Sequence, residues 1–273
     1  YLQYFSDVEK NFYCNFLGGK MMKKFMSVVV AILMVFGISA SVTGVFANEG
    51  NLEYKVVSDL KVDKNWLGIK TGISGKVNLN NTITASPVEK VEGTDDLYQG
   101  NISSSVESAD LFEGAYQLYE KEFKGKTDFL NRAWENIVMF NEGGNFPTAQ
   151  YTIKFPSNFN IDKDAITATE NTATISSIEA KYNDTDNSVT ITAKLGNWND
   201  YKGFFGLVAG ERNQTGHRID VNIPYTVDAS VSTSDELGTV TGFGNCFLYK
   251  CSGSGQGRIV NITAENTAYT VFK

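Results

Sequence analysis

The sequence predicts a mainly β, α+β fold, in which a β-sandwich carries short inserted helices and follows an N-terminal signal peptide. Three observations lead to this prediction. A basic pair followed by an apolar run stands near residue 30, most segments after residue 48 alternate polar and apolar residues, and helical spacing is confined to short stretches. The chain after residue 48 is also rich in Thr, Asn, Gly and Tyr, which favours a β-rich exported protein.

Residues 21–47 have the three parts of a signal peptide in the expected order. Lys23 and Lys24 precede an unbroken apolar run at 28–38, and small residues end the segment at Ala47. A signal-peptide core has ~7–15 apolar residues, so we expect cleavage after Ala47. The alternative is an uncleaved membrane anchor, because no charge follows Lys24 before Ala47 and ~20 such residues can span a bilayer.

The first twenty residues precede this signal and require a separate explanation. The Gly-Gly-Lys that ends this stretch can be encoded by a purine-rich ribosome-binding sequence just before Met21. We therefore expect residues 1–20 to be an untranslated leader or upstream read-through. The alternative is that Tyr1 is where a gene fragment begins. Residues 1–47 are left out of the fold prediction in either case.

The expected mature chain, 48–273, is acidic. The leader holds four lysines and two acids, so the remaining chain has a net charge of −9. An acidic protein without a basic cluster argues against nucleic acid and anionic lipid as partners. We expect an extracellular protein or glycan as partner, and contact with the membrane only through the signal segment if it stays uncleaved.

The segment 48–142 is expected to contain strands followed by a helical hairpin. "NLEYKVVSDLKV" and "GISGKVNLNNTITASP" alternate with the period of half-buried strands. The apolar residues of a first helix then recur at helical spacing between Leu111 and Phe123, and a break follows at Gly125. Thr127 can cap a second helix, whose apolar face would consist of Leu130, Trp134, Ile137 and Val138.

The segment 143–273 is expected to form an immunoglobulin-like β-sandwich with one inserted helix. "TAQYTIKFP", "ISSIEAKYNDTDNSVTITAKLG", "HRIDVNIPYTVD", "GTVTGFGNCFLYKC", "GRIVNITA" and "TAYTVFK" read as strands joined by polar turns. The helix lies in "NWNDYKGFFGLVAGERNQ", where Asn199 can form the cap. Its inner face would consist of Tyr201, Phe204, Phe205 and Val208.

A family resemblance follows from the export signal, the Thr/Asn-rich strands, "KFPSNFNI" and the long strand that enters a polar turn. In these features residues 145–273 resemble the immunoglobulin-like or adhesin-type β-sandwich modules of Gram-positive secreted and surface proteins. Cohesin-like scaffold modules have a similar character. The resemblance implies a secreted or cell-surface, non-enzymatic binding or adhesion protein. An exported hydrolase acting on glycan or peptide, and a structural subunit of a surface assembly, remain alternatives.

Two pairs of residues are candidate sites. Trp198 and Tyr201 either form an exposed ligand platform or belong to the core with the inner face of their helix. Cys246 and Cys251 can form a disulfide in an oxidising compartment. In one continuous strand, however, their Cα atoms would lie ~16 Å apart, which is too far for a disulfide bond.

The sequence assigns no catalytic, cofactor-binding or metal-binding residue, and we expect no cofactor. His217 is the only histidine, and no G-x-S-x-G nucleophile motif accompanies it. "NDTDN" at 183–187 lacks the glycine and the closing glutamate of a calcium loop. A Lys154–Asn261 isopeptide bond, as found in some Gram-positive sandwich domains, is not expected because Lys154 lies on the polar face of its strand.

Overall fold

The computed structural model describes residues 56–273, except 129, 197–199, 233 and 251–256. The described residues belong to one compact unit, Tyr54–Lys273. The expected leader and signal peptide lie outside the described residues, as do Trp198, Asn199 and Cys251.

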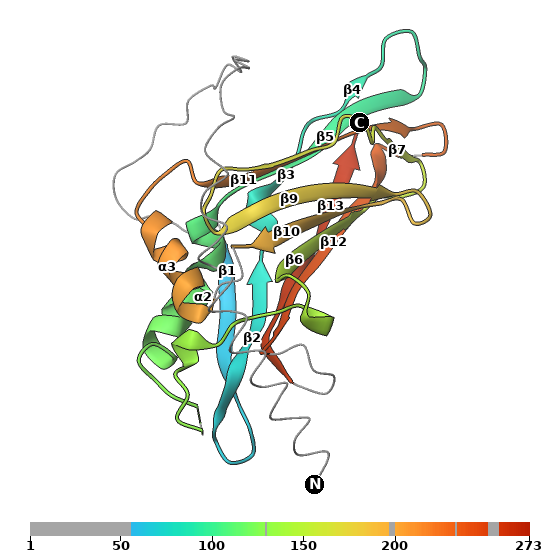
Figure 1. Ribbon diagram of the computed structural model, residues 1–273. Helices are drawn as coiled ribbons and strands as arrows, with labels where there is room; N and C mark the ends of the chain where they lie inside the picture. Colours follow the sequence, from blue (N-terminus) through green and yellow to red (C-terminus); the bar gives the residue numbers. More distant parts are fainter. Residues whose placement is uncertain (1–55, 129, 197–199, 233, 251–256) are drawn as a thin grey trace. The chain divides into compact units, whose positions relative to one another are not determined.

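Two sheets form the framework, which confirms the predicted β-sandwich with inserted helices (Figure 1). Sheet A has seven strands in the order β1 (Val57–Lys64), β2 (Lys70–Asn78), β13 (Arg258–Phe272), β12 (Glu236–Tyr249), β6 (Thr148–Lys154), β10 (Ser188–Leu195) and β9 (Ile175–Asn183). Sheet B has the order β3 (Ile83–Ala85), β5 (Leu97–Glu107), β11 (Arg218–Asp228) and β7 (Phe159–Ile161), with β4 (Glu89–Lys90) beside β5 and β8 (Thr167–Glu170) beside β11. Strands β2 and β13 pair in parallel, and the other pairs are antiparallel.

Alternating residues from both sheets fill the space between them. On β11, Ile219, Val221 and Ile223 are buried, as their spacing predicts. Ile153 on β6 and Phe155, directly after this strand, are buried, while Lys154 between them is exposed. This period-two burial forms one continuous apolar cluster from the strands of both sheets.

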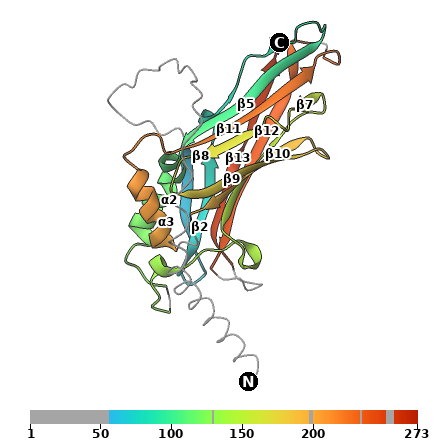
Figure 2. The same ribbon diagram turned by 45° about the horizontal axis from the view of Figure 1, so that its top comes forward.

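A second core lies where two helices cover sheet A. Helices α2 (Ser108–Glu122) and α3 (Tyr201–Glu211) lie side by side (Figure 2), and α2 packs against β1. The closest approach is at Gly114 of α2, where a Cβ atom would lie 2.4 Å from the Cβ of Ser58 on β1. Glycine at this position therefore lets the helix pack directly on the strand.

The expected second helix of the hairpin is wrong. Residues Thr127 and Ala133 instead form an antiparallel bridge, and a single 3-10 turn, η3 (Trp134–Asn136), follows. The physical reason is Asp128, whose carboxylate accepts hydrogen bonds from the backbone N–H groups of Leu130 and Arg132 at 2.9 and 3.0 Å. This arrangement favours a compact loop over a helix. Leu130, expected on an inner helical face, is consequently exposed.

Strand β5 is an element that the sequence patterns did not predict. It pairs along its whole length with β11, from Leu97↔Asp228 to Glu107↔Arg218. Strands from the segments before and after residue 142 thus share both sheets. Two further 3-10 turns, η2 (Asn80–Thr82) and η4 (Glu142–Gly144), connect strands. In the described part of the chain, no helix has the length and apolar character needed to cross a membrane.

Candidate functional site

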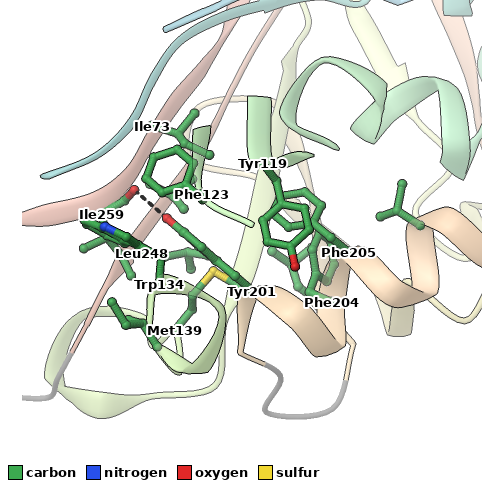
Figure 3. Close-up of a cluster of buried hydrophobic side chains, with 14 of the residues drawn as sticks. Ile73, Tyr119, Phe123, Trp134, Met139, Tyr201, Phe204, Phe205, Leu248 and Ile259 are labelled. Atoms are coloured by element: carbon green, nitrogen blue, oxygen red, sulfur yellow. Dashed lines mark hydrogen bonds between the residues drawn. The ribbon is translucent and has the colours of Figure 1, made fainter. Parts of the chain in front are cut away.

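Tyr201 belongs to the core and not to an exposed platform. Its side chain is fully buried, and its hydroxyl donates a hydrogen bond of 3.1 Å to the carbonyl of Ile259 (Figure 3). Burial raises the pKa of Tyr201 well above its ordinary value. The helix begins after Asp200, whose carboxylate accepts from the backbone N–H of Gly203 at 2.7 Å, so Asp200 is the cap in place of the expected Asn199.

Cys246 lies on β12 and packs against the core beneath the helices. Burial raises the pKa of its thiol to about 12, so the thiolate form is strongly disfavoured. Its expected partner Cys251 is outside the described residues, and the disulfide stays a prediction.

His217 is part of a polar cluster at the end of α3. Its Nδ1 lies 3.3 Å from the carboxylate of Glu211, and its Nε2 lies 3.0 Å from the side-chain oxygen of Gln214. The buried Glu211 also accepts hydrogen bonds from the hydroxyls of Ser108 and Thr172 and from the backbone N–H of Ala173. The cluster thereby joins the start of α2, the end of α3 and the β8–β9 connection.

The hydrogen bonds in this cluster also set the protonation of Glu211. Burial alone would raise its pKa, but the bonds from Ser108, Thr172 and the Ala173 amide outweigh that effect and hold the pKa below its ordinary value. Because Ser108 donates its hydroxyl proton to Glu211 and not to the imidazole, the arrangement differs from a Ser–His–acid catalytic triad. The geometry supports a structural role.

A polar groove of about 340 Å³ lies on sheet B, and we call it the hydroxyl groove. Nearly all of its lining residues carry a hydroxyl, amide or carboxylate group: Asn81, Thr82, Thr84, Ser103, Ser104, Ser105, Thr167, Asp220, Val221 and Asn222. Strand register explains how these side chains come together. Thr84 on β3, Ser103 on β5, Asn222 on β11 and Thr167 on β8 stand opposite one another in one row across four strands.

A second row of the groove holds a fixed carboxylate. Asp220 on β11 stands opposite Ser105 on β5, and the hydroxyl of Ser105 donates to the Asp220 carboxylate. Arg218 donates through Nε to the same hydroxyl at 2.9 Å and through Nη1 to Glu107 at 3.2 Å. This network orients Asp220, whose side chain remains about half exposed.

Other polar groups in the groove are available to a ligand. Within the described residues, the side chains of Asn222 and Thr167 form no hydrogen bond, whereas Thr84 and Ser103 pair with each other at 2.9 Å. No aromatic ring is among the lining residues. The groove therefore offers hydrogen bonds with little apolar contact, which suits a hydroxylated and uncharged ligand.

Sequence reasoning did not identify the groove. The run Ser103–Ser105 has no apolar alternation, and the outward positions of β11 stand out only once β11 is aligned with β5. Within the described residues, no group of three or more His, Cys, Asp or Glu side chains is placed to hold a metal ion.

The comparisons with known proteins give only distant structural likenesses. No family model matches the chain, and no curated protein matches it significantly. Among solved structures, the collagen-binding domain from a Staphylococcus aureus adhesin is 7% identical with a TM-score of 0.28, and the match covers 70% of this chain and 97% of that one.

Two pilins are also among the similar structures. A C-terminal fragment of the Streptococcus agalactiae major pilin GBS80 is 9% identical with a TM-score of 0.33, and the match covers 70% of this chain and 55% of the fragment. The Bacillus cereus major pilin subunit BcpA is 12% identical with a TM-score of 0.29, with 79% and 48% covered. The chain thus spans about half the length of each pilin structure. Likenesses at this level assign no residue a role.

Proposed function

We propose that this chain is a secreted or cell-surface, non-enzymatic binding module, and that its hydroxyl groove binds a neutral glycan. The observation that carries the proposal is the groove itself, in which an oriented Asp220 carboxylate and an unpaired Asn222 amide stand among hydroxyl groups. The export segment at 21–47 and the adhesin-like pattern of 145–273 support the location and the adhesion role.

The chemistry of the groove favours a glycan. A carboxylate can accept hydrogen bonds from two sugar hydroxyls, and an amide offers both donors and an acceptor. Arg218 pairs with Glu107 and lies 3.8 Å from Asp220, so these three groups carry one net negative charge, which disfavours an anionic ligand. Rigid strands fix the positions of these groups, so little ordering is required when a ligand binds.

The proposal is tested by titrating the protein with chitohexaose and with cellohexaose, and by following the amide signals of the groove in NMR spectra. We expect shifts at Ser103–Ser105 and at Asp220–Asn222 with at least one of these glycans. Asp220→Ala and Asn222→Ala should each weaken binding by about tenfold or more. The control is Thr241→Ala, which removes an exposed hydroxyl from β12 in the other sheet. Equal affinity of all variants, or no shift in the groove with either glycan, would contradict the proposal.

A further inference from the structure

The turn between β1 and β2 displays two large apolar side chains in an unusual place. Trp66 is 89% exposed and the adjacent Leu67 is 59% exposed. Tight turns normally carry Gly, Asn, Asp, Ser or Pro, because these residues suit turn geometry and water. Figure 1 shows this turn reaching past the ends of the neighbouring strands.

The backbone of this turn does not depend on the two apolar side chains. The side-chain oxygen of Asn65 accepts hydrogen bonds from the N–H groups of Leu67 and Ile69 at 3.0 and 2.9 Å. Gly68 takes the left-handed conformation, with φ of 76°, and donates its N–H to the carbonyl of Asn65. Since the turn is already held by Asn65 and Gly68, folding gives no reason for exposing Trp66.

A third apolar side chain is exposed on another loop. Leu130 is 56% exposed on the loop that Asp128 organises. That loop and the base of the hairpin border a common cleft of about 480 Å³, lined by Ile69, Lys70, Gly125, Lys126, Thr127, Asp128 and Trp134. The end of the β1–β2 turn and the loop organised by Asp128 thus border one cleft, and we call the turn, the loop and the cleft the hairpin end.

Among the described residues, the hairpin end has two ammonium groups without an ion-pair partner and one such carboxylate, that of Asp63, which accepts a hydrogen bond from the Ser74 hydroxyl. Lys70 pairs with Glu122 at 2.7 Å, and Asp128 pairs with other cations of its surroundings. Lys64 and Lys126 are both exposed, and neither ammonium group has an ion-pair partner within the described residues. Lys64 directly precedes the apolar turn and Lys126 lines the cleft, in a chain whose formal net charge is −7.

We propose that the hairpin end docks onto an anionic lipid bilayer, with Trp66 and Leu67 entering the interface and Lys64 and Lys126 facing the lipid phosphates. Tryptophan favours the membrane interface, because its ring is apolar and its N–H remains able to hydrogen-bond. Basic residues near an anionic surface strengthen such contacts.

Charge and form favour the bilayer over other occupants. A second copy would bring two patches that each carry unpaired lysines against each other, and like charges disfavour such contact. A bilayer requires no preformed pocket for a protruding turn, and it combines an apolar layer with negative charge. The expectation that anionic lipid is excluded as a partner rested on net charge, which does not describe this local distribution.

The test is co-sedimentation with vesicles of equal parts phosphatidylglycerol and phosphatidylcholine. The chain from residue 48 is used, because the apolar segment before it would bind lipid itself and the described fold lies within residues 54–273. We expect binding that falls about tenfold or more in Trp66→Ser. The double variant Lys64→Glu with Lys126→Glu should also lose binding, by about five-fold or more for each lysine. The matched control is Phe243→Ser, which removes an exposed aromatic ring from the middle of β12.

Three outcomes would overturn the proposal. The first is an absence of vesicle binding by the parent chain, and the second is binding that Trp66→Ser leaves unchanged. The third combines two results: soluble polyphosphate suppresses vesicle binding by the parent chain, and the Trp66→Ser variant binds polyphosphate as tightly as the parent. Together they would show that the site recognises phosphate alone. Concentration-dependent dimerisation that Trp66→Ser abolishes, without vesicle binding, would assign the turn to a second copy instead.

Discussion

Replacing Phe205 by alanine should destabilise the fold strongly, because its ring lies at the centre of the helix-covered core. Phe205 is 4% exposed. Its ring stacks on Tyr119 at 4.6 Å between centroids and lies 5.4 Å from Phe204 and 5.9 Å from Tyr201. A buried Phe→Ala change costs ~3–5 kcal/mol. The several ring contacts place Phe205 in the upper part of this range, at about 4–5 kcal/mol.

Thermal unfolding followed by circular dichroism measures this loss. For a unit of this size each kcal/mol lowers Tm by roughly 2–4 °C, so Phe205→Ala should melt about 8–20 °C below the parent. The control is Phe243→Ala, in which a ring that is 47% exposed is removed from a strand, with an expected change of about 1 kcal/mol or less. If Phe205→Ala melts with the parent, α3 does not close the core as described, and the reasoning fails.

Three further predictions concern other parts of the fold. The pKa of Glu211 is lowered in the fold, so its contribution to stability is present above the ordinary carboxyl pKa and is lost as pH falls through the lowered value. In urea unfolding, the parent and Glu211→Gln should therefore differ strongly in free energy of unfolding at pH 7, and this difference should shrink in acid. Gly114→Ala should cost about 1–3 kcal/mol by overpacking against Ser58, and adding Ser58→Gly should restore most of this stability. Asp128→Asn should cost about 1–3 kcal/mol of stability, because the carboxylate accepts from two backbone amides and pairs with Arg132 and Lys250. The variant should also be cleaved faster by proteases within 124–134, and an unchanged cleavage rate would contradict the role of Asp128 in the loop.

The sequence predicted elements well where one face of the element is buried. The alternation of Ile219, Val221 and Ile223 defined β11, and the spacing of Tyr201 and Phe205 defined the inner face of α3, because burial imposes these periods. The second helix was wrong because a local interaction of Asp128 outweighed a helical pattern. Strand β5 was missed because its central serines carry no hydrophobic signal, and its pairing with β11 is a long-range contact.

The candidate sites were beyond sequence reasoning for a related reason. The hydroxyl groove combines ordinary polar residues from β3, β5, β8 and β11, and only the strand register places Asn222 in the same row as Thr84. Trp66 was visible in the sequence, but a Trp in a β-hairpin turn can fold back on its strands. Its exposure is evident only from the structure, as is the cleft that Ile69 of the same turn borders.

The two proposed sites can act at the same time, because they belong to different parts of the framework. The hydroxyl groove lies on sheet B, the β1–β2 turn belongs to sheet A, and the two sets of lining residues have no member in common. Each is held by its own hydrogen bonds, through Ser105 and Arg218 in the groove and through Asn65 in the turn. Distant sites without shared contacts usually behave additively. A chain that docks through Trp66 can therefore keep its groove open to a glycan, which is the arrangement that a surface binding module requires.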